Sequence, residues 1–223
     1  MAKRKQGWSL LKVITHVGAL IPLILLAWEF WQVSPTSPLM INPFQEITLR
    51  TGKAAIVLLM LSLAVTPINT VFGYRQVIPL RKILGLYAFM YAAIHFSIFI
   101  VDNGFVESSI DLVAVYEATF EKRFALVGFA ALMILLPLAI TSNRWSMRQL
   151  RKNWKRLHRF VYLAGILAVF HFIWLVKSDI REPLIFAAIL TVLLVLRVPA
   201  VRRYVVHIRT RLTNRNRPVM GGA

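Results

Sequence analysis

Two histidines lie deep inside long apolar stretches of the chain, where ionisable side chains are rare and usually functional. His95 lies about 12 residues into the stretch 83–101, and His171 lies about 12 residues into the stretch 159–177. At a rise of about 1.5 Å per helical residue, each imidazole is roughly 18 Å from the start of its helix. Two neutral imidazoles at matching depth can bind a haem iron from both sides. The alternative is that each histidine forms a hydrogen bond to a neighbouring helix.

Two further histidines lie near the ends of apolar stretches. His158 precedes His171 by 13 residues. That spacing is roughly 20 Å along one helix and suits a second haem iron, although the two side chains point about 140° apart. The third stretch carries Arg81 and Lys82 at the level of His158, and no histidine, so a fourth ligand would have to be His16. His16 could equally contact a quinone or pack as a polar residue between helices. The simpler alternative for His158 is a histidine at the membrane interface.

Basic side chains near these histidines are candidates for binding the propionates of a haem. They are Arg81, Lys82 and Arg156, and Arg is the better ligand because its planar guanidinium binds a carboxylate through two nitrogen atoms. The simpler interpretation is that they face lipid headgroups or water, as we expect for His207 in the basic tail. The sequence carries no Ser/His/Asp triad, P-loop, G-x-G-x-x-G or metal-hydrolase spacing, so no catalytic residue is expected.

The chain that positions these residues has 223 residues, is 58% hydrophobic and has no cysteine. Soluble domains are about half apolar, so this hydrophobic fraction is too high for a soluble domain. The missing cysteines exclude disulfides, iron–sulfur clusters and thiolate haem ligands. Stretches of about 20 apolar residues can cross the hydrocarbon core as helices. The sequence therefore predicts an all-α integral membrane protein, a six-transmembrane-helix bundle without repeats, with spans at about 13–32, 54–72, 83–101, 123–141, 159–177 and 183–200.

The charged residues are divided between the two sides of these spans. The net charge is +18, and all but six of the 27 Lys and Arg residues lie in the two terminal segments, in the 73–82 and 142–158 loops, or at the helix ends that adjoin them. The opposite side holds all nine acidic residues and the other six basic ones, Arg50, Lys53, Lys122, Arg123, Lys177 and Arg181. Basic residues gather on the cytoplasmic side of membrane proteins. We therefore expect both termini in the cytoplasm of a bacterial cell, with the chain in its inner membrane.

This topology divides the chain into a basic cytoplasmic N-terminus (1–12), a transmembrane domain (13–200) and a basic cytoplasmic tail (201–223). The tail is too short for a flavin or nicotinamide domain. One outer loop, 102–122, is acidic and is either a solvated loop or a docking surface for a partner by charge complementarity. Its carboxylates are Asp102, Glu107, Asp111, Glu117 and Glu121.

The segments around the histidines resemble the MsrQ family, formerly YedZ. The family supplies the membrane haem subunit of the bacterial MsrPQ methionine sulfoxide reductase system. The resemblance covers most of the chain, and its two histidine motifs are the most specific part. More distantly, the chain is similar to the ferric reductase and NADPH oxidase transmembrane domain. The segments are RKILGLYAFMYAAIHF (81–96), WKRLHRFVYLAGILAVFHFIW (154–174), KVITHVGALIP (12–22) and EPLIFAAILTVLLVLR (182–197).

The resemblance implies that His95, His158 and His171 bind haem b, and that the family also binds FMN, for which these residues show no signal of their own. It further implies that electrons pass from membrane quinones of the respiratory pool to MsrP. MsrP is a periplasmic molybdopterin enzyme that repairs oxidised proteins and would form a heterodimer with this chain, with the catalytic site on MsrP. The oxidase relatives have two pairs of histidines. Here the partner of His158 on the third span is missing, so we expect one haem and leave a second open.

Two other functions stay open on the sequence. The chain would be the transmembrane core of a ferric or oxygen reductase if a separate cytosolic flavin protein supplied its electrons. It would be a small transporter or assembly factor if the buried histidines only join helices. A visible haem spectrum separates that last class from the first two.

Overall fold

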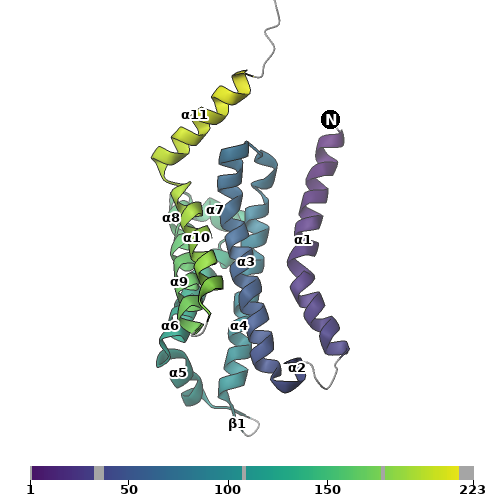
Figure 1. Cartoon of the computed structure of the whole chain (residues 1–223), viewed down its shortest axis with the longest axis vertical. Helices are drawn as coiled ribbons and strands as arrows, with labels where there is room; N and C mark the ends of the chain where they lie inside the picture. The colour runs from purple at the N-terminus through teal and green to yellow at the C-terminus, as the bar shows by residue number, and fades with distance from the viewer. Residues whose placement is uncertain (1, 33–37, 107–108, 177–178, 216–223) are drawn as a thin grey trace, which may run out of the picture.

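The structure, a computed structural model, is a bundle of long helices and describes residues 2–32, 38–106, 109–176 and 179–215 (Figure 1). Two residues named above, Glu107 and Lys177, lie outside these ranges. The long helices are α1 (Ala2–Trp31), α3 (Pro43–Phe72), α4 (Leu80–Gly104), α6 (Arg123–Ile140), α9 (Phe160–Leu175), α10 (Arg181–Val195) and α11 (Pro199–Arg215).

Five of the predicted spans are confirmed as helices long and apolar enough to cross a membrane, and the sixth differs. The predicted span 183–200 is broken after Val195, and α10 and α11 meet at an angle of 76°. The break falls where apolar residues give way to a basic sequence that begins at Arg197, followed by Pro199, whose ring favours a helix start. The predicted tail is therefore helical as far as Arg215.

The predicted loops contain short elements that cap the bundle. They are α2 (Pro38–Ile41), the 3₁₀ helix η1 (Arg75–Val77), β1 (Phe105–Val106), β2 (Ser109–Ile110), α5 (Leu112–Phe120), α7 (Arg144–Leu150) and α8 (Lys152–Leu157). The two strands pair antiparallel, with Phe105 opposite Ile110. The described part of the outer acidic loop thus contains regular secondary structure.

Helix α3 begins well before the predicted start at residue 54, because its first turns have their own polar stabilisation. The Asn42 side chain accepts a hydrogen bond from the Gln45 backbone N–H at 3.2 Å, and Pro43 occupies the first helical position. The helix ends at Gly73, whose φ of 77° is the left-handed conformation that favours glycine. The extension places Thr48 and Gly52 inside a continuous helix.

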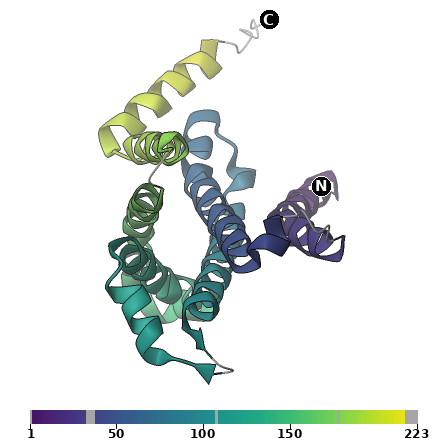
Figure 2. The same cartoon turned by 60° about the horizontal axis from the view of Figure 1, so that its bottom comes forward.

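The bundle is built from two helical hairpins, α3 with α4 and α6 with α9, and α10 packs against α9 and α3. Helix α1 lies outside these hairpins, beside α3 and α4 (Figure 2). One polar link to the bundle is the buried Tyr91, whose hydroxyl donates to the Ala19 carbonyl oxygen at 2.8 Å and accepts from the Leu23 N–H at 3.3 Å. This bridge lies beside Pro22, which has no N–H to donate.

Ion pairs join the helices at the end of the bundle that carries α2 and α5. Arg50 on α3 contacts Glu29 on α1 at 2.6 Å and Glu46 one turn earlier at 2.7 Å. Lys53 on α3 contacts Glu182 on α10 at 2.6 Å. Two of the basic residues at this acidic end, Arg50 and Lys53, therefore join α1, α3 and α10.

An arginine that the sequence analysis did not single out joins three helices at the opposite, basic end. Pro67 lies inside α3 and has no N–H, so the Leu63 carbonyl oxygen one turn earlier loses its usual helical donor. Arg197, just after α10, donates to that oxygen at 2.5 Å and to the Tyr162 hydroxyl at 2.5 Å. Its guanidinium also lies 4.8 Å from the centre of the Tyr162 ring. The end of α10 is thereby bound to α3 and α9.

Replacing Arg197 with Met should lower the stability of the purified protein, because Pro67 cannot supply the lost donor to Leu63. The expected loss of unfolding free energy is about 1–3 kcal/mol, measured by thermal unfolding in detergent. Pro67→Ala restores a backbone N–H at the right position, so it should cost less stability in the Arg197→Met background than in the unaltered protein. Strictly additive effects of the two substitutions would contradict this link.

Candidate functional site

His95 is held by the backbone of the helix that packs beside its own. Its Nδ1 lies 2.8 Å from the carbonyl oxygen of Thr48 on α3. A carbonyl oxygen only accepts, so Nδ1 carries the proton and Nε2 presents a lone pair. Gly52 lies one turn after Thr48, and a Cβ placed there would be 2.9 Å from Nδ1. The glycine therefore lets the imidazole lie directly against α3.

His171 is held in the same way by the other hairpin. Its Nδ1 lies 2.7 Å from the carbonyl oxygen of Phe124 on α6. A Cβ at Gly128 would be 2.6 Å from the same nitrogen, closer than real atoms approach. The proton is again fixed on Nδ1, and Nε2 is left with a lone pair.

The two halves of the site are copies of one arrangement. In each, the histidine follows its carbonyl partner by 47 residues. The interval between the halves is constant, 76 residues from His95 to His171 and also from Gly52 to Gly128. Both halves carry Gly-x-Ala-Ala on the first helix and Ala-x₃-Ala-x₂-His-Phe on the second. The expectation that the chain has no repeats is therefore wrong at this site.

The structure places the His95 and His171 rings next to each other, edge to face. Their ring centroids are 6.0 Å apart, and their planes are close to perpendicular, at 85°. Imidazole nitrogen binds transition metals at about 2 Å, so a metal between two imidazoles holds the ring centres roughly 6 Å apart. The observed separation matches that value. This short distance agrees with the expectation that His95 and His171 lie at matching depth on two helices.

The kind of metal group that fits is limited by the small number of protein ligands. Among the described residues, no cluster of three or more His, Cys, Asp or Glu side chains could hold a metal ion. Two imidazoles alone suit a metal whose remaining positions are filled by its own macrocycle, as in haem. The glycines keep both rings in place for such a group, so the residues present fit it.

Phenylalanines form an apolar wall next to the pair. Phe96, the residue after His95, lies 5.2 Å from Phe129 between ring centroids, and Phe129 lies 5.6 Å from Phe120. Phe124, which supplies the carbonyl partner, also lies 6.3 Å from the His171 ring. The wall comes from α4, α5 and α6 and gives the imidazoles apolar neighbours.

His158 lies at the basic end and is engaged with its own neighbours. Its ring stacks on Trp154 at 3.9 Å between centroids, and its Nδ1 lies 3.1 Å from the Trp154 carbonyl oxygen. Its Nε2 lies 3.4 Å from the hydroxyl of Ser142. To bind a metal, His158 would have to exchange this last contact for the metal.

His16 lies on the exposed outer helix and contacts the bundle through Tyr87. Its Nδ1 is 3.0 Å from the Tyr87 hydroxyl on α4, and the two rings meet edge to face. No contact within the described residues joins His16 to His158, so the structure does not bring these two together. His207 lies on α11 and is exposed, in agreement with the expectation that it faces water or lipid headgroups.

The three basic candidates for haem propionates, Arg81, Lys82 and Arg156, are exposed at the basic end. Arg81 lies close enough to His158 and Arg197 for their charges to interact. These basic residues lie at the end of the bundle that carries His158, away from the pair of His95 and His171. Any anionic group they bind would lie at the level of His158.

Several residues of the site were missed from the sequence, Gly52 and Gly128 above all. The signal that identifies them is the shared pattern of the two halves, which appears only when the chain is compared with itself at an interval of 76 residues. Thr48 and Phe124 contribute only a backbone oxygen, and no side-chain pattern can mark such a role.

Comparisons with known proteins agree on the type of protein. The model of a family described as ferric reductase like transmembrane component matches residues 51–169. The protein-methionine-sulfoxide reductase heme-binding subunit MsrQ of Xanthomonas axonopodis pv. citri is 45% identical over 204 residues, which cover 89% of this chain and 90% of that protein. The MsrQ of Bordetella pertussis is 35% identical over 192 residues, which cover 85% and 89%. No solved structure matches the chain.

The helical bundle and the family match define a multi-pass membrane protein with a ferric reductase-like transmembrane domain. The matched region includes Gly52 and His95 of the first half and Phe124 and Gly128 of the second, and it ends two residues before His171. The identity to curated relatives extends over almost the whole chain and narrows the class further. The chain belongs to the MsrQ family of bacterial membrane proteins.

Proposed function

We propose that this chain binds one haem b between His95 and His171 and passes electrons through it to a methionine sulfoxide reductase outside the cytoplasm. The observation that supports this most directly is the pair of adjacent imidazoles, 6.0 Å apart, each with its Nδ1 proton held by a backbone carbonyl. The curated relatives are named as heme-binding subunits of protein-methionine-sulfoxide reductase.

The protein residues hold and orient the proposed cofactor. Nε2 of each histidine would bind the iron, while the hydrogen bond from Nδ1 to the Thr48 or Phe124 carbonyl fixes the tautomer and raises the basicity of the ligand. When bound, a haem supplies one-electron redox chemistry that no side chain of this site offers. The phenylalanine wall lowers the local dielectric constant, which tunes the reduction potential.

The division of charge supports a direction for the electrons. The basic end, with α7, α8 and α11, would face the cytoplasm, and the acidic end would face the periplasm of the inner membrane. The partner would dock at the acidic end, where Asp102, Glu117 and Glu121 are exposed. Asp111 is partly used there, because it caps α5 through hydrogen bonds from Val113 and Ala114.

Some expectations from the family resemblance are still without assigned residues. A quinone donor and FMN rest on the resemblance alone, with His16 as the one residue put forward for a quinone contact. A second haem at His158 would need a partner ligand, and the basic residues at the same end of the bundle would be the place for its propionates. The proposed haem at His95 and His171 depends on none of these proposals.

The ligand pair is tested by replacing each histidine and measuring haem. His95→Ala and His171→Ala should each lose most of the haem in a pyridine haemochrome assay, or change a low-spin absorption spectrum to a high-spin one, because one axial bond is lost. His207→Ala, at an exposed position on α11, is the control and should keep the spectrum. Full haem content with an unshifted low-spin spectrum in both His95→Ala and His171→Ala would rule the pair out.

Two further variants separate ligation from packing. Gly128→Ala keeps both histidines but places a methyl group where His171 Nδ1 lies, so it should weaken haem retention and shift the spectrum. Gly18→Ala is a matched control, because a Cβ there meets no other atom within 4 Å.

In the same haem assay, His158→Ala and His16→Ala show whether a cytoplasmic-side haem exists. A partial loss of haem on His158→Ala supports one, and an unchanged spectrum leaves a single haem.

The orientation is tested with single cysteines, since the natural chain has none. Ser109→Cys at the acidic end should react with a membrane-impermeant thiol reagent on intact spheroplasts, and Gln149→Cys at the basic end should not. Both positions are exposed, so burial does not protect either one. After permeabilisation both should label. The reverse pattern on intact spheroplasts would overturn the orientation and the direction of electron flow.

The partner is tested by following the reduced-haem absorbance in membranes that contain this chain and a quinol donor. Addition of MsrP with methionine sulfoxide should speed the loss of that absorbance, in proportion to MsrP at low concentration. MsrP without methionine sulfoxide is the control. If the rate stays the same over a range of MsrP concentrations but rises when ferric iron or oxygen is added, the result would favour a stand-alone reductase.

A further inference from the structure

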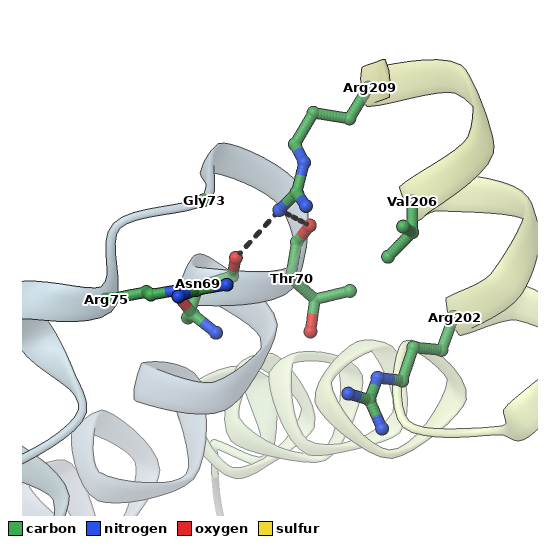
Figure 3. A pocket seen from close by; sticks show the side chains of 7 residues that line it. All are labelled: Asn69, Thr70, Gly73, Arg75, Arg202, Val206 and Arg209. Carbon is green, nitrogen blue, oxygen red and sulfur yellow. Dashed lines mark hydrogen bonds between the residues drawn. The ribbon is translucent and has the colours of Figure 1, made fainter. Parts of the chain in front are cut away.

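A polar cavity lies between the end of α3 and the side of α11, at the basic end of the bundle. It has a volume of about 240 Å³ and is lined by Asn69, Thr70, Gly73, Arg75, Arg202, Val206 and Arg209 (Figure 3). Three of the seven lining residues are arginines and none is acidic. The cavity is therefore strongly electropositive and has room for a small anionic group.

One of the three arginines builds the cavity wall. Arg209 donates through Nη1 to the carbonyl oxygens of Asn69 and Thr70, at 3.2 Å and 2.9 Å (Figure 3). These oxygens lie at the C-terminal end of α3, where the helix dipole favours a cation. The contact fixes α11 to α3 and holds the cavity open between them.

The other two arginines lack a carboxylate partner. Within the described residues, neither Arg75 nor Arg202 forms an ion pair. The side-chain oxygen of Asn69 is buried and has no hydrogen-bond partner. A buried amide without a partner is costly, whichever way its oxygen and nitrogen are placed. The cavity thus combines two uncompensated cations with an unsatisfied amide.

The position of the cavity indicates where its ligand comes from. Helix α11 turns by 76° from α10 at the end of the membrane spans, so it leaves the direction of the bundle there. Its residues Val201, Val205 and Ile208 form an apolar stripe next to the face that carries Arg202 and Arg209. A basic helix with such a stripe lies in the membrane interface, with its apolar side toward the acyl chains.

We propose that this cavity binds the headgroup of an anionic phospholipid with a hydroxylated headgroup, of the phosphatidylglycerol type. The phosphate would lie between Arg75 and Arg202, whose guanidinium groups bind phosphate oxygens in pairs. A headgroup hydroxyl, as donor and acceptor, would satisfy the Asn69 side chain. The acyl chains would lie along the apolar stripe of α11. The lipid would thereby fasten α11 to the end of α3.

The proposal is tested on the full-length chain in detergent by native mass spectrometry with added lipid. Phosphatidylglycerol should bind at lower concentration than phosphatidylcholine, and inorganic phosphate should compete only weakly. Arg202→Gln and Arg75→Gln should each weaken phosphatidylglycerol binding about fivefold, as expected for one arginine near an anionic lipid. Arg203→Gln is the matched control, because Arg203 is exposed on α11 and does not line the cavity.

The outcomes distinguish the sources of the phosphate. Equal affinity for phosphatidylglycerol and phosphatidylcholine, or an equal loss in Arg203→Gln and Arg202→Gln, would overturn the site. Full displacement of the lipid by millimolar inorganic phosphate would assign the cavity to free phosphate and overturn the lipid proposal. Unchanged thermal unfolding of Arg202→Gln without lipid, together with loss of its stabilisation by phosphatidylglycerol, would support it.

Discussion

The hydrogen bond from an imidazole Nδ1 to a backbone carbonyl of the adjacent helix is the contact on which the site depends. It occurs twice, from His95 to Thr48 and from His171 to Phe124. Each bond fixes the tautomer of its ring, the rotation of the ring and its distance from the supporting helix. The hairpins α3–α4 and α6–α9 then set the distance between the rings. A shift of either hairpin by 1 Å would change the ring separation that suits a metal.

Proline explains why some polar contacts in this bundle are placed where they are. Pro67 frees the Leu63 carbonyl oxygen, and Arg197 supplies its donor from α10. One residue from Pro22, the Tyr91 hydroxyl is inserted between the Ala19 carbonyl oxygen and the Leu23 N–H and links α1 to α4. In lipid no water can satisfy a freed carbonyl oxygen, so the Arg197 donor compensates for Pro67 in the way that such a helix requires. The same contacts hold the outer helices, α1 and α10, to the two hairpins.

The sequence was sufficient to predict the spans and the two central histidines, because both depend on local composition. The apolar runs predict helices, and a histidine inside such a run is conspicuous. The break after Val195 was missed, because hydropathy alone runs on to Val201. The roles of Gly52 and Gly128 depend on how closely two helices approach, and the bond between Arg197 and Leu63 joins residues 134 apart. Neither is visible in a local pattern.

The atoms that accept the hydrogen bonds from the two imidazole rings belong to the main chain. This determines which amino-acid substitutions the site can tolerate. Position 48 is Thr and position 124 is Phe, yet both supply the same oxygen at nearly the same distance. A substitution at either position alters a side chain and leaves the acceptor in place. The ring geometry therefore specifies two residue types at four positions, histidine at 95 and 171 and glycine at 52 and 128. The side chains at positions 48 and 124 can change without removing the oxygen that holds each ring.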